Sequence, residues 1–194
     1  MAKRVFLITL MMWVFVSHAT GQNRDESQAK VGCAMGHIAI AVRDLNKSIE
    51  WYHNVMGFVL AKEPIEIDTD TSPLGEIAHG LFGKGLKKLR IAQMVGANHV
   101  GIELFQFVLP ESKNNDRQEF SKTGLLHMCV VASDVELVAR KIKGNGGKVR
   151  VENHAETTDK KVVFCEDLDG NVIEVSGQNW ADKDAALVRE KKSK

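Results

Sequence analysis

The chain has 194 residues, of which 44% are hydrophobic and 26% are charged, and its net charge is +1 at pH 7. This length suffices for one compact domain with its own core, and the composition is that of an ordinary globular protein. Nothing in a net charge so close to zero points to nucleic acid or to an anionic membrane surface, so neither is predicted as a partner.

The N-terminus has the layout of a secretory signal peptide. Lys3 and Arg4 precede the apolar residues 5–16, and residues 17–21 supply the small side chains that suit cleavage. The apolar run is shorter than the roughly 20 residues that span a bilayer. We therefore predict a signal peptide over 1–21 and a flexible segment over 22–35. The protein is expected to be secreted, or periplasmic in a bacterium, with no membrane attachment after cleavage; an uncleaved anchor is the alternative.

Residues 36–108 have the pattern of one mixed module. Alternation over 36–42 predicts a strand, and apolar residues at helical spacing over 45–56 predict an amphipathic helix that ends at Gly57. A short strand is expected over 58–61, a long loop over 68–85, and a hairpin with strands over 87–95 and 99–108. Residues 109–123 are polar, lack periodicity, and are interpreted as a linker.

Residues 124–176 repeat this order. A strand is expected over 125–131 and a helix over 135–143. Three further strands are expected over 148–151, 161–166 and 171–176, with a turn at 167–171 between the last two. The βαβββ order thus occurs twice, and residues 177–194 form a tail.

The two halves also match residue by residue. His37 lies seven residues before Asp44, and His127 lies seven residues before Asp134; in both copies a glycine follows the aspartate by thirteen residues. Each copy later reaches an apolar strand that holds one glutamate. An internal repeat of this kind indicates two copies of one structural unit.

Each repeat therefore contributes one histidine and one glutamate: His37 with Glu103, and His127 with Glu174. Imidazole and carboxylate ligands together suit Zn, Fe, Ni, Co or Mn, with positions left open for water or substrate. A glutamate inside an apolar strand is costly to bury unpaired, and a bound metal removes that cost. The alternative is that the histidines are ordinary strand residues and that both glutamates face water.

Two other features leave alternatives open. The three cysteines, Cys33, Cys129 and Cys165, allow either one disulfide with one thiol or three separate thiols. Asn46 begins a glycosylation sequon, but it also stands where a helix starts and suits a helix cap. The sequence does not choose between a monomer and a homodimer.

Several motifs appear in a fixed order: S-I-E-W-Y at 48–52, G-I-E-L-F at 101–105, and D-G-N-V-I-E-V at 169–175. Over residues 36–176 the chain resembles the vicinal oxygen chelate superfamily, the glyoxalase and bleomycin-resistance fold. The resemblance implies an α+β domain in which two βαβββ modules, 36–108 and 124–176, form a curved mixed sheet around a metal cleft. It also implies that the first and fourth strands of each module supply the metal ligands, here His37, Glu103, His127 and Glu174.

The resemblance further implies a reaction. In that family the metal binds two neighbouring oxygens of a small-molecule substrate and stabilises an enolate-like anion, and a set of two histidines and two glutamates resembles that of glyoxalase I. Glu103 and Glu174 are then the candidate catalytic bases. The function expected is that of a secreted metal-dependent lyase or isomerase of the lactoylglutathione lyase type. The alternative is a non-catalytic secreted protein for ligand binding or the extracellular matrix.

Two positions depart from the glyoxalase I pattern. Where that enzyme has an arginine four residues after its first histidine, this chain has Ala41; where it has an asparagine four residues after its first glutamate, this chain has Phe107. The clamp for glutathione is therefore missing. We expect a smaller substrate in a cleft walled by Phe105 or Phe107 and closed by the loop over 68–85.

Overall fold

The computed structural model describes residues 33–113, 121, 123–153 and 162–178. The chain divides into two compact units, Met1–Ala34 and Met35–Lys194, and every described helix and strand lies in the second unit. The predicted signal peptide lies outside the described residues, as do most of the predicted N-terminal segment and C-terminal tail. None of the described helices combines the length and the apolar character needed to cross a membrane.

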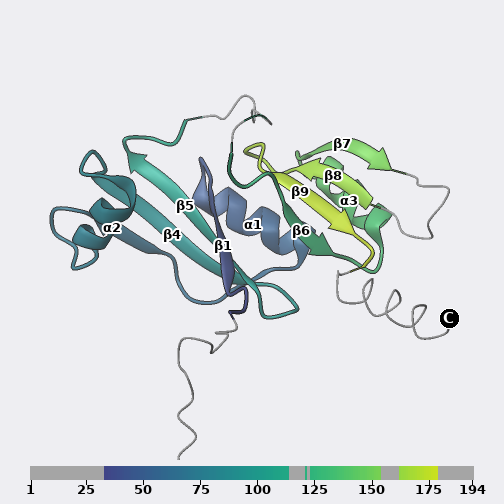
Figure 1. The fold of residues 1–194 in the computed structure, drawn as a ribbon, viewed down its shortest axis with the longest axis horizontal. Helices are drawn as coiled ribbons and strands as arrows, with labels where there is room; N and C mark the ends of the chain where they lie inside the picture. Colours follow the sequence, from purple (N-terminus) through teal and green to yellow (C-terminus); the bar gives the residue numbers. More distant parts are fainter. Residues whose placement is uncertain (1–32, 114–120, 122, 154–161, 179–194) are drawn as a thin grey trace, which may run out of the picture. The chain divides into compact units, whose positions relative to one another are not determined.

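The first module contains a five-stranded sheet and two helices (Figure 1). Strand β1 runs parallel to β5, β4 lies antiparallel to β5, and both β2 and β3 pair with β4. Its elements are β1 (His37–Ala41), α1 (Leu45–Met56), β2 (Val59–Leu60), β3 (Ile65–Asp68), α2 (Gly75–Phe82), β4 (Lys88–Val95) and β5 (Gly101–Leu109).

The second module contains a four-stranded sheet in the order β6-β9-β8-β7, with one helix. Strand β6 runs parallel to β9, and the other pairs are antiparallel. Its elements are β6 (Met128–Val131), α3 (Val135–Gly144), β7 (Lys148–Asn153), β8 (Val162–Glu166) and β9 (Val172–Ser176). The predicted α+β class and the repeated module are confirmed, and the strands form two sheets, one in each module.

Helix α1 has the predicted bounds because both of its ends carry strong local signals. The Asp44 carboxylate accepts a hydrogen bond from the backbone N–H of Lys47, and this bond lowers the pKa of Asp44. Gly57 closes the helix at a φ of 75°, a conformation that favours glycine. The buried face of the helix packs against β4 and β5. In α3 the Asp134 carboxylate caps the backbone N–H of Leu137 in the same way.

The long loop predicted over 68–85 is wrong, because this segment contains helix α2. The helix has no side-chain hydrogen bond at its N-terminal cap, so the usual sequence signal is missing. It is held instead by packing, since Ala78 is buried in a cluster with Leu89 and Phe105. Strand β3, which pairs antiparallel with β4, was also not predicted.

The two modules are joined by a buried polar contact. The Tyr52 hydroxyl donates to the Asp167 carboxylate over 2.8 Å, and Asn171 donates to the same oxygen. Burial raises the pKa of Asp167 and raises that of Tyr52 well above its usual value, the latter with a contribution from the nearby Asp167 charge. Arg43 reaches across the same boundary and contacts Asp169 over 2.6 Å. These contacts tie α1 to the turn before β9.

Trp51 and Tyr52 belong to the core, with 5% and 0% exposure. The structure describes all three cysteines and links no two of them; Cys165 is buried, whereas Cys33 and Cys129 are exposed.

Candidate functional site

The first candidate pair, His37 and Glu103, comes together on one face of the first sheet. The register of the parallel strands places Ala39 beside Glu103, and alternation along β1 puts His37 on the same face. The imidazole Nε2 lies 3.6 Å from the carboxylate Oε2. The histidine side chain is 60% exposed and the glutamate 17%, so the pair is open to solvent on the imidazole side.

A third residue, Gln93, holds the glutamate from the other side. It stands opposite Glu103 in the antiparallel pairing of β4 and β5, and its Nε2 donates to Glu103 Oε1 over 2.7 Å. The two carboxylate oxygens therefore have different partners: one faces the amide and the other faces His37. Sequence reasoning missed Gln93, because only the strand register places it next to the glutamate.

The pair lines a pocket of about 240 Å³ at the end of the sheet. His99 also lines this pocket; it lies in the hairpin between β4 and β5 and has a φ of 62°, an uncommon conformation for a residue other than glycine. Sequence reasoning gave His99 no role, and the positive φ could not be read from the sequence. The lining residues are Gly36, His37, Ala61, Gln93, Met94, Val95, His99, Gly101, Ile102 and Glu103.

The second candidate pair, His127 and Glu174, repeats this arrangement in the second module. Its Nε2–Oε2 distance is 3.0 Å, and the side chains are 35% and 18% exposed. Cys129 occupies the register position beside Glu174 that Ala39 occupies beside Glu103. The position opposite Glu174 on β8 is held by Phe164, whose ring packs edge-on against the His127 ring at 5.4 Å between centroids.

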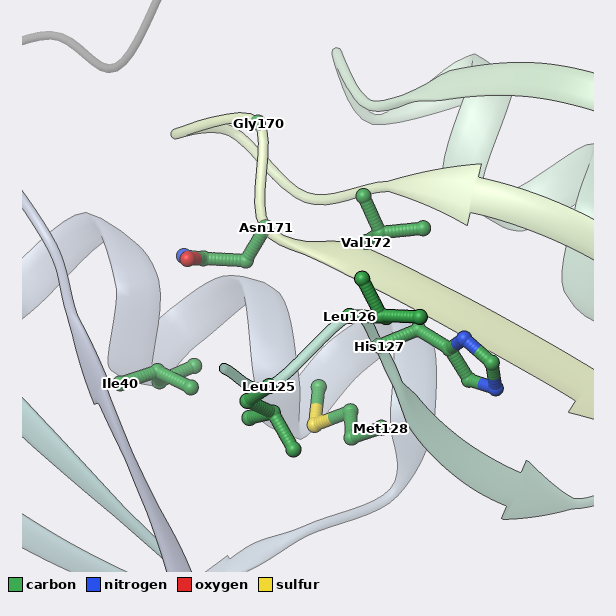
Figure 2. Close-up of a pocket in the computed structure, with 8 residues that line it drawn as sticks. All are labelled: Ile40, Leu125, Leu126, His127, Met128, Gly170, Asn171 and Val172. Atoms are coloured by element: carbon green, nitrogen blue, oxygen red, sulfur yellow. The ribbon is translucent and has the colours of Figure 1, made fainter. Parts of the chain in front are cut away.

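A pocket of about 230 Å³ lies next to His127 (Figure 2). The imidazole points away from Ile40 and Leu125, while the Asn171 side chain extends toward the first module, where it donates to the carbonyl of Ala41. The lining residues are Ile40, Leu125, Leu126, His127, Met128, Gly170, Asn171 and Val172.

The spacing within each pair fits two ligands of one metal ion. Nitrogen and oxygen ligands at about 2.1 Å from a metal, separated by 90° to 110°, lie about 3.0 to 3.4 Å apart. The His127–Glu174 distance of 3.0 Å lies in this range, and the His37–Glu103 distance of 3.6 Å is slightly above it. Both distances equally suit an ion pair when the imidazole is protonated. The donor chemistry of both pairs therefore fits a divalent metal.

One chain brings these four residues together only as two pairs. Among the residues that the structure describes, no three histidine, cysteine, aspartate or glutamate side chains form a group that could hold a metal ion. Each pair alone supplies two ligands, fewer than the three protein ligands typical of a catalytic metal site.

Beyond Glu103, the same face of the sheet is covered by aromatic residues. Phe105 and Phe107 follow the glutamate at intervals of two along β5, and Phe82 from α2 packs edge-on against both, at 5.5 and 5.1 Å between centroids. Phe105 is 9% exposed. His79 lies on α2 and is half-buried, and its Nε2 is 3.1 Å from the carbonyl oxygen of Leu86.

Comparison with solved structures gives the same fold. A glyoxalase family protein from Bacillus cereus matches with a TM-score of 0.63 and 21% identity, over 76% of this chain and 96% of that one. Glyoxalase I from Leishmania major, described as trypanothione-dependent, matches at 0.57 and 16% identity, over 84% of this chain and 100% of that one. A FosX fosfomycin resistance protein from Listeria monocytogenes, solved with Mn(II) and a dihydroxypropylphosphonic acid, matches at 0.50 and 13%, over 77% and 94%.

No curated protein sequence matches the chain. A family model does: that of the Glyoxalase/Bleomycin resistance protein/Dioxygenase superfamily matches residues 34–175, which include both modules and all four candidate ligands. Divalent metals and small-molecule substrates are features of this superfamily. The repeated module, the parallel pairing of first and last strands and the family match lead to one conclusion: the chain belongs to the Glyoxalase/Bleomycin resistance protein/Dioxygenase superfamily.

Proposed function

We propose that this protein binds a divalent metal through His37, Glu103, His127 and Glu174 and uses it as a lyase or isomerase on a small substrate with two neighbouring oxygens. The observation that carries the proposal is the repeat: each module independently brings one imidazole and one carboxylate to ligand spacing on matching strands. Two accidental ion pairs in equivalent places are a weaker explanation than one ligand set.

The metal, when bound, would act as a Lewis acid toward the substrate oxygens. The protein's own groups then have two tasks. His37 and His127 offer neutral nitrogen donors, and Glu103 and Glu174 offer charged oxygen donors that can also accept a proton from a neighbouring carbon. Zn, Ni, Mn, Fe and Co all suit this donor set.

The complete site is proposed to form between two copies of the chain. A single chain presents two separate pairs, each with two ligands. A symmetric dimer would bring the first-module pair of one copy to the second-module pair of the other, and it would build two equal sites.

The substrate is proposed to be smaller than a glutathione adduct. Ala41 and Phe107 stand where a glyoxalase I clamp would need an arginine and an asparagine, and neither side chain can bind a carboxylate. Phe82, packed on Phe105 and Phe107, fills the sheet face beyond Glu103 and leaves less room there. We also propose that the protein acts outside the cytosol, on the basis of residues 1–21.

The metal assignment is tested by the metal content of the purified protein. His127→Ala should lose stoichiometric divalent metal, because loss of a ligand opens the coordination shell. His53→Ala is the matched control, since this exposed histidine lies on α1 outside both pairs and should keep the metal. A His127→Ala protein with the same metal content as the wild type would refute the assignment.

Turnover separates the catalytic proposal from the second candidate, ligand binding without reaction. The metal-loaded protein should act on a small vicinal-oxygen compound and should be poor with methylglyoxal plus glutathione. A kcat/KM of about 10⁴ M⁻¹s⁻¹ or more on the latter pair would make the protein a working glyoxalase. Metal binding without turnover on any such compound would favour the binding function.

A further inference from the structure

The two carboxylates of the proposed ligand set differ in their surroundings. Glu103 accepts a 2.7 Å hydrogen bond from the side-chain amide of Gln93, directly opposite on β4. At the matching position of the second module, opposite Glu174 on β8, the residue is Phe164, which has no hydrogen-bond donor. Within the described part of the chain, His127 is the polar side chain that contacts Glu174.

We propose that Gln93 is a positioning residue that fixes Glu103 as a permanent metal ligand. The proposal rests on the function proposed above. The hydrogen bond occupies Oε1 and so turns Oε2 toward His37, where the metal would lie. Only the NH₂ group of Gln93 can face a carboxylate oxygen, because two acceptor oxygens would repel each other.

The strand register makes this contact rigid. Gln93 and Glu103 are a directly paired couple in the antiparallel ladder, and the neighbouring residues Met94 and Ile102 are 1% and 3% exposed. Both side chains therefore project from backbone that is fixed by ladder hydrogen bonds and by the core behind it. A partner that orients a metal ligand from such a scaffold typically changes metal affinity 10- to 100-fold when it is removed.

Glu174 has no hydrogen-bond donor at the matching position of the neighbouring strand. Phe164, opposite Glu174 on β8, packs its ring edge-on against the His127 ring and offers no amide to the carboxylate. Gln93 therefore sets Glu103 apart as the carboxylate with a hydrogen-bonded partner on the neighbouring strand.

The test is Zn²⁺ titration of the full-length protein by calorimetry, with the urea unfolding midpoint of the metal-free protein measured in parallel. Gln93→Met keeps the length of the side chain and removes the amide, and Gln93→Leu removes it with a shorter side chain. Both should weaken Zn²⁺ binding about 10- to 100-fold. The unfolding midpoint should change little, because the amide acts on the metal site and not on the core. The visible spectrum of bound Co²⁺ should also change, since it reports the arrangement of ligands.

Lys88→Met is the control on the same strand, because Lys88 pairs with Glu66 and belongs to neither ligand pair; it should leave the affinity unchanged. Equal affinity of wild type and Gln93→Met would overturn the inference, and so would an equal loss in Lys88→Met. A wild-type protein that binds no Zn²⁺ or Co²⁺ would instead overturn the proposed function, and the inference with it.

Discussion

Glu103 and Glu174 occupy equivalent places in the repeat, and both are less than one-fifth exposed. A glutamate in such a position can serve as a ligand alone or as a ligand that also takes a proton. The two tasks are separable by chemistry, because an amide oxygen can still coordinate a metal but cannot act as a base.

Glu174→Gln should therefore keep the metal and lose turnover, by about 10²- to 10⁴-fold in kcat, which is the usual contribution of a general base. Metal per chain and kcat on an identified substrate are the two measurements. Glu103→Gln is the companion variant; whichever of the two retains metal and loses the greater share of kcat carries the proton. Full activity in both variants would exclude a proton-transfer role for either glutamate.

Asp167 is a second residue whose surroundings determine its chemistry. Burial raises the pKa of its carboxyl group above the ordinary value of 3.8, even though Tyr52 and Asn171 donate to it. The folded state thus keeps the proton at a pH where the unfolded state has already lost it. The stabilisation from Asp167 is fully present below about pH 3.8 and is lost as the pH rises through the folded-state pKa.

Asp167→Asn cannot titrate, so the difference in unfolding free energy between wild type and this variant should depend on pH in that direction. The wild type should be relatively more stable at pH 3 than at pH 7. Urea unfolding at a series of pH values measures the difference, in which contributions from other groups cancel. A difference that stays constant, or that grows with pH, would show that hydrogen bonding outweighs burial at this carboxylate.

At the scale of elements, the sequence predicted those parts whose signals are local. The apolar spacing and Gly57 predicted α1 with its observed bounds, but the helix cap expected at Asn46 is wrong, because Asp44 caps the helix and Asn46 lies inside it. Helix α2 was missed because its N-terminal cap makes no side-chain hydrogen bond and because it packs on Phe105, a residue distant in sequence. A helix stabilised mainly by tertiary packing leaves little trace in its own sequence.

Gly75 shows how closely α2 approaches the segment that follows β3. A Cβ added there would overlap the backbone oxygen of Thr69, which anchors the preceding loop through hydrogen bonds to Leu86 and Lys87. Gly75→Ala should therefore destabilise the protein by about 1–3 kcal/mol, as overpacking does elsewhere.

Gly80→Ala is the control on the same helix. A Cβ at Gly80 meets nothing within 4 Å, so alanine should be neutral or should stabilise the helix by up to about 1 kcal/mol. Both variants can be compared by urea unfolding. Equal changes in the free energy of unfolding would mean that the loop around Thr69 moves at little cost to accommodate the added Cβ.

At the scale of the whole molecule, the repeat could be found from the sequence, but the grouping of its residues could not. Matching spacings identified His37 and His127, and the strand motifs identified the two glutamates. Gln93 and His99 became visible only with the strand register and the hairpin, because both depend on contacts that no local pattern specifies. The separation of the ligands into two pairs is likewise visible only in the structure.

This separation leads to a complementation experiment. If the site forms between two copies, a His37→Ala chain paired with a His127→Ala chain would build one site with both defects and one intact site. Neither variant alone should bind metal. An equal mixture, unfolded and refolded together, should regain about one-quarter of the wild-type metal per chain, since half of the random dimers are mixed and each has one intact site of two.

The control is a mixture of His127→Ala with Glu174→Ala. Both defects then lie in the second-module pair, so no combination of chains restores a complete site and no metal should return. After gel filtration, the metal content is measured for His37→Ala alone, His127→Ala alone and the two mixtures, and is compared with that of the wild type. If the first mixture stays empty while the wild type is loaded, the two modules of a single chain must close on each other to bind the metal, and the proposed arrangement between copies is wrong.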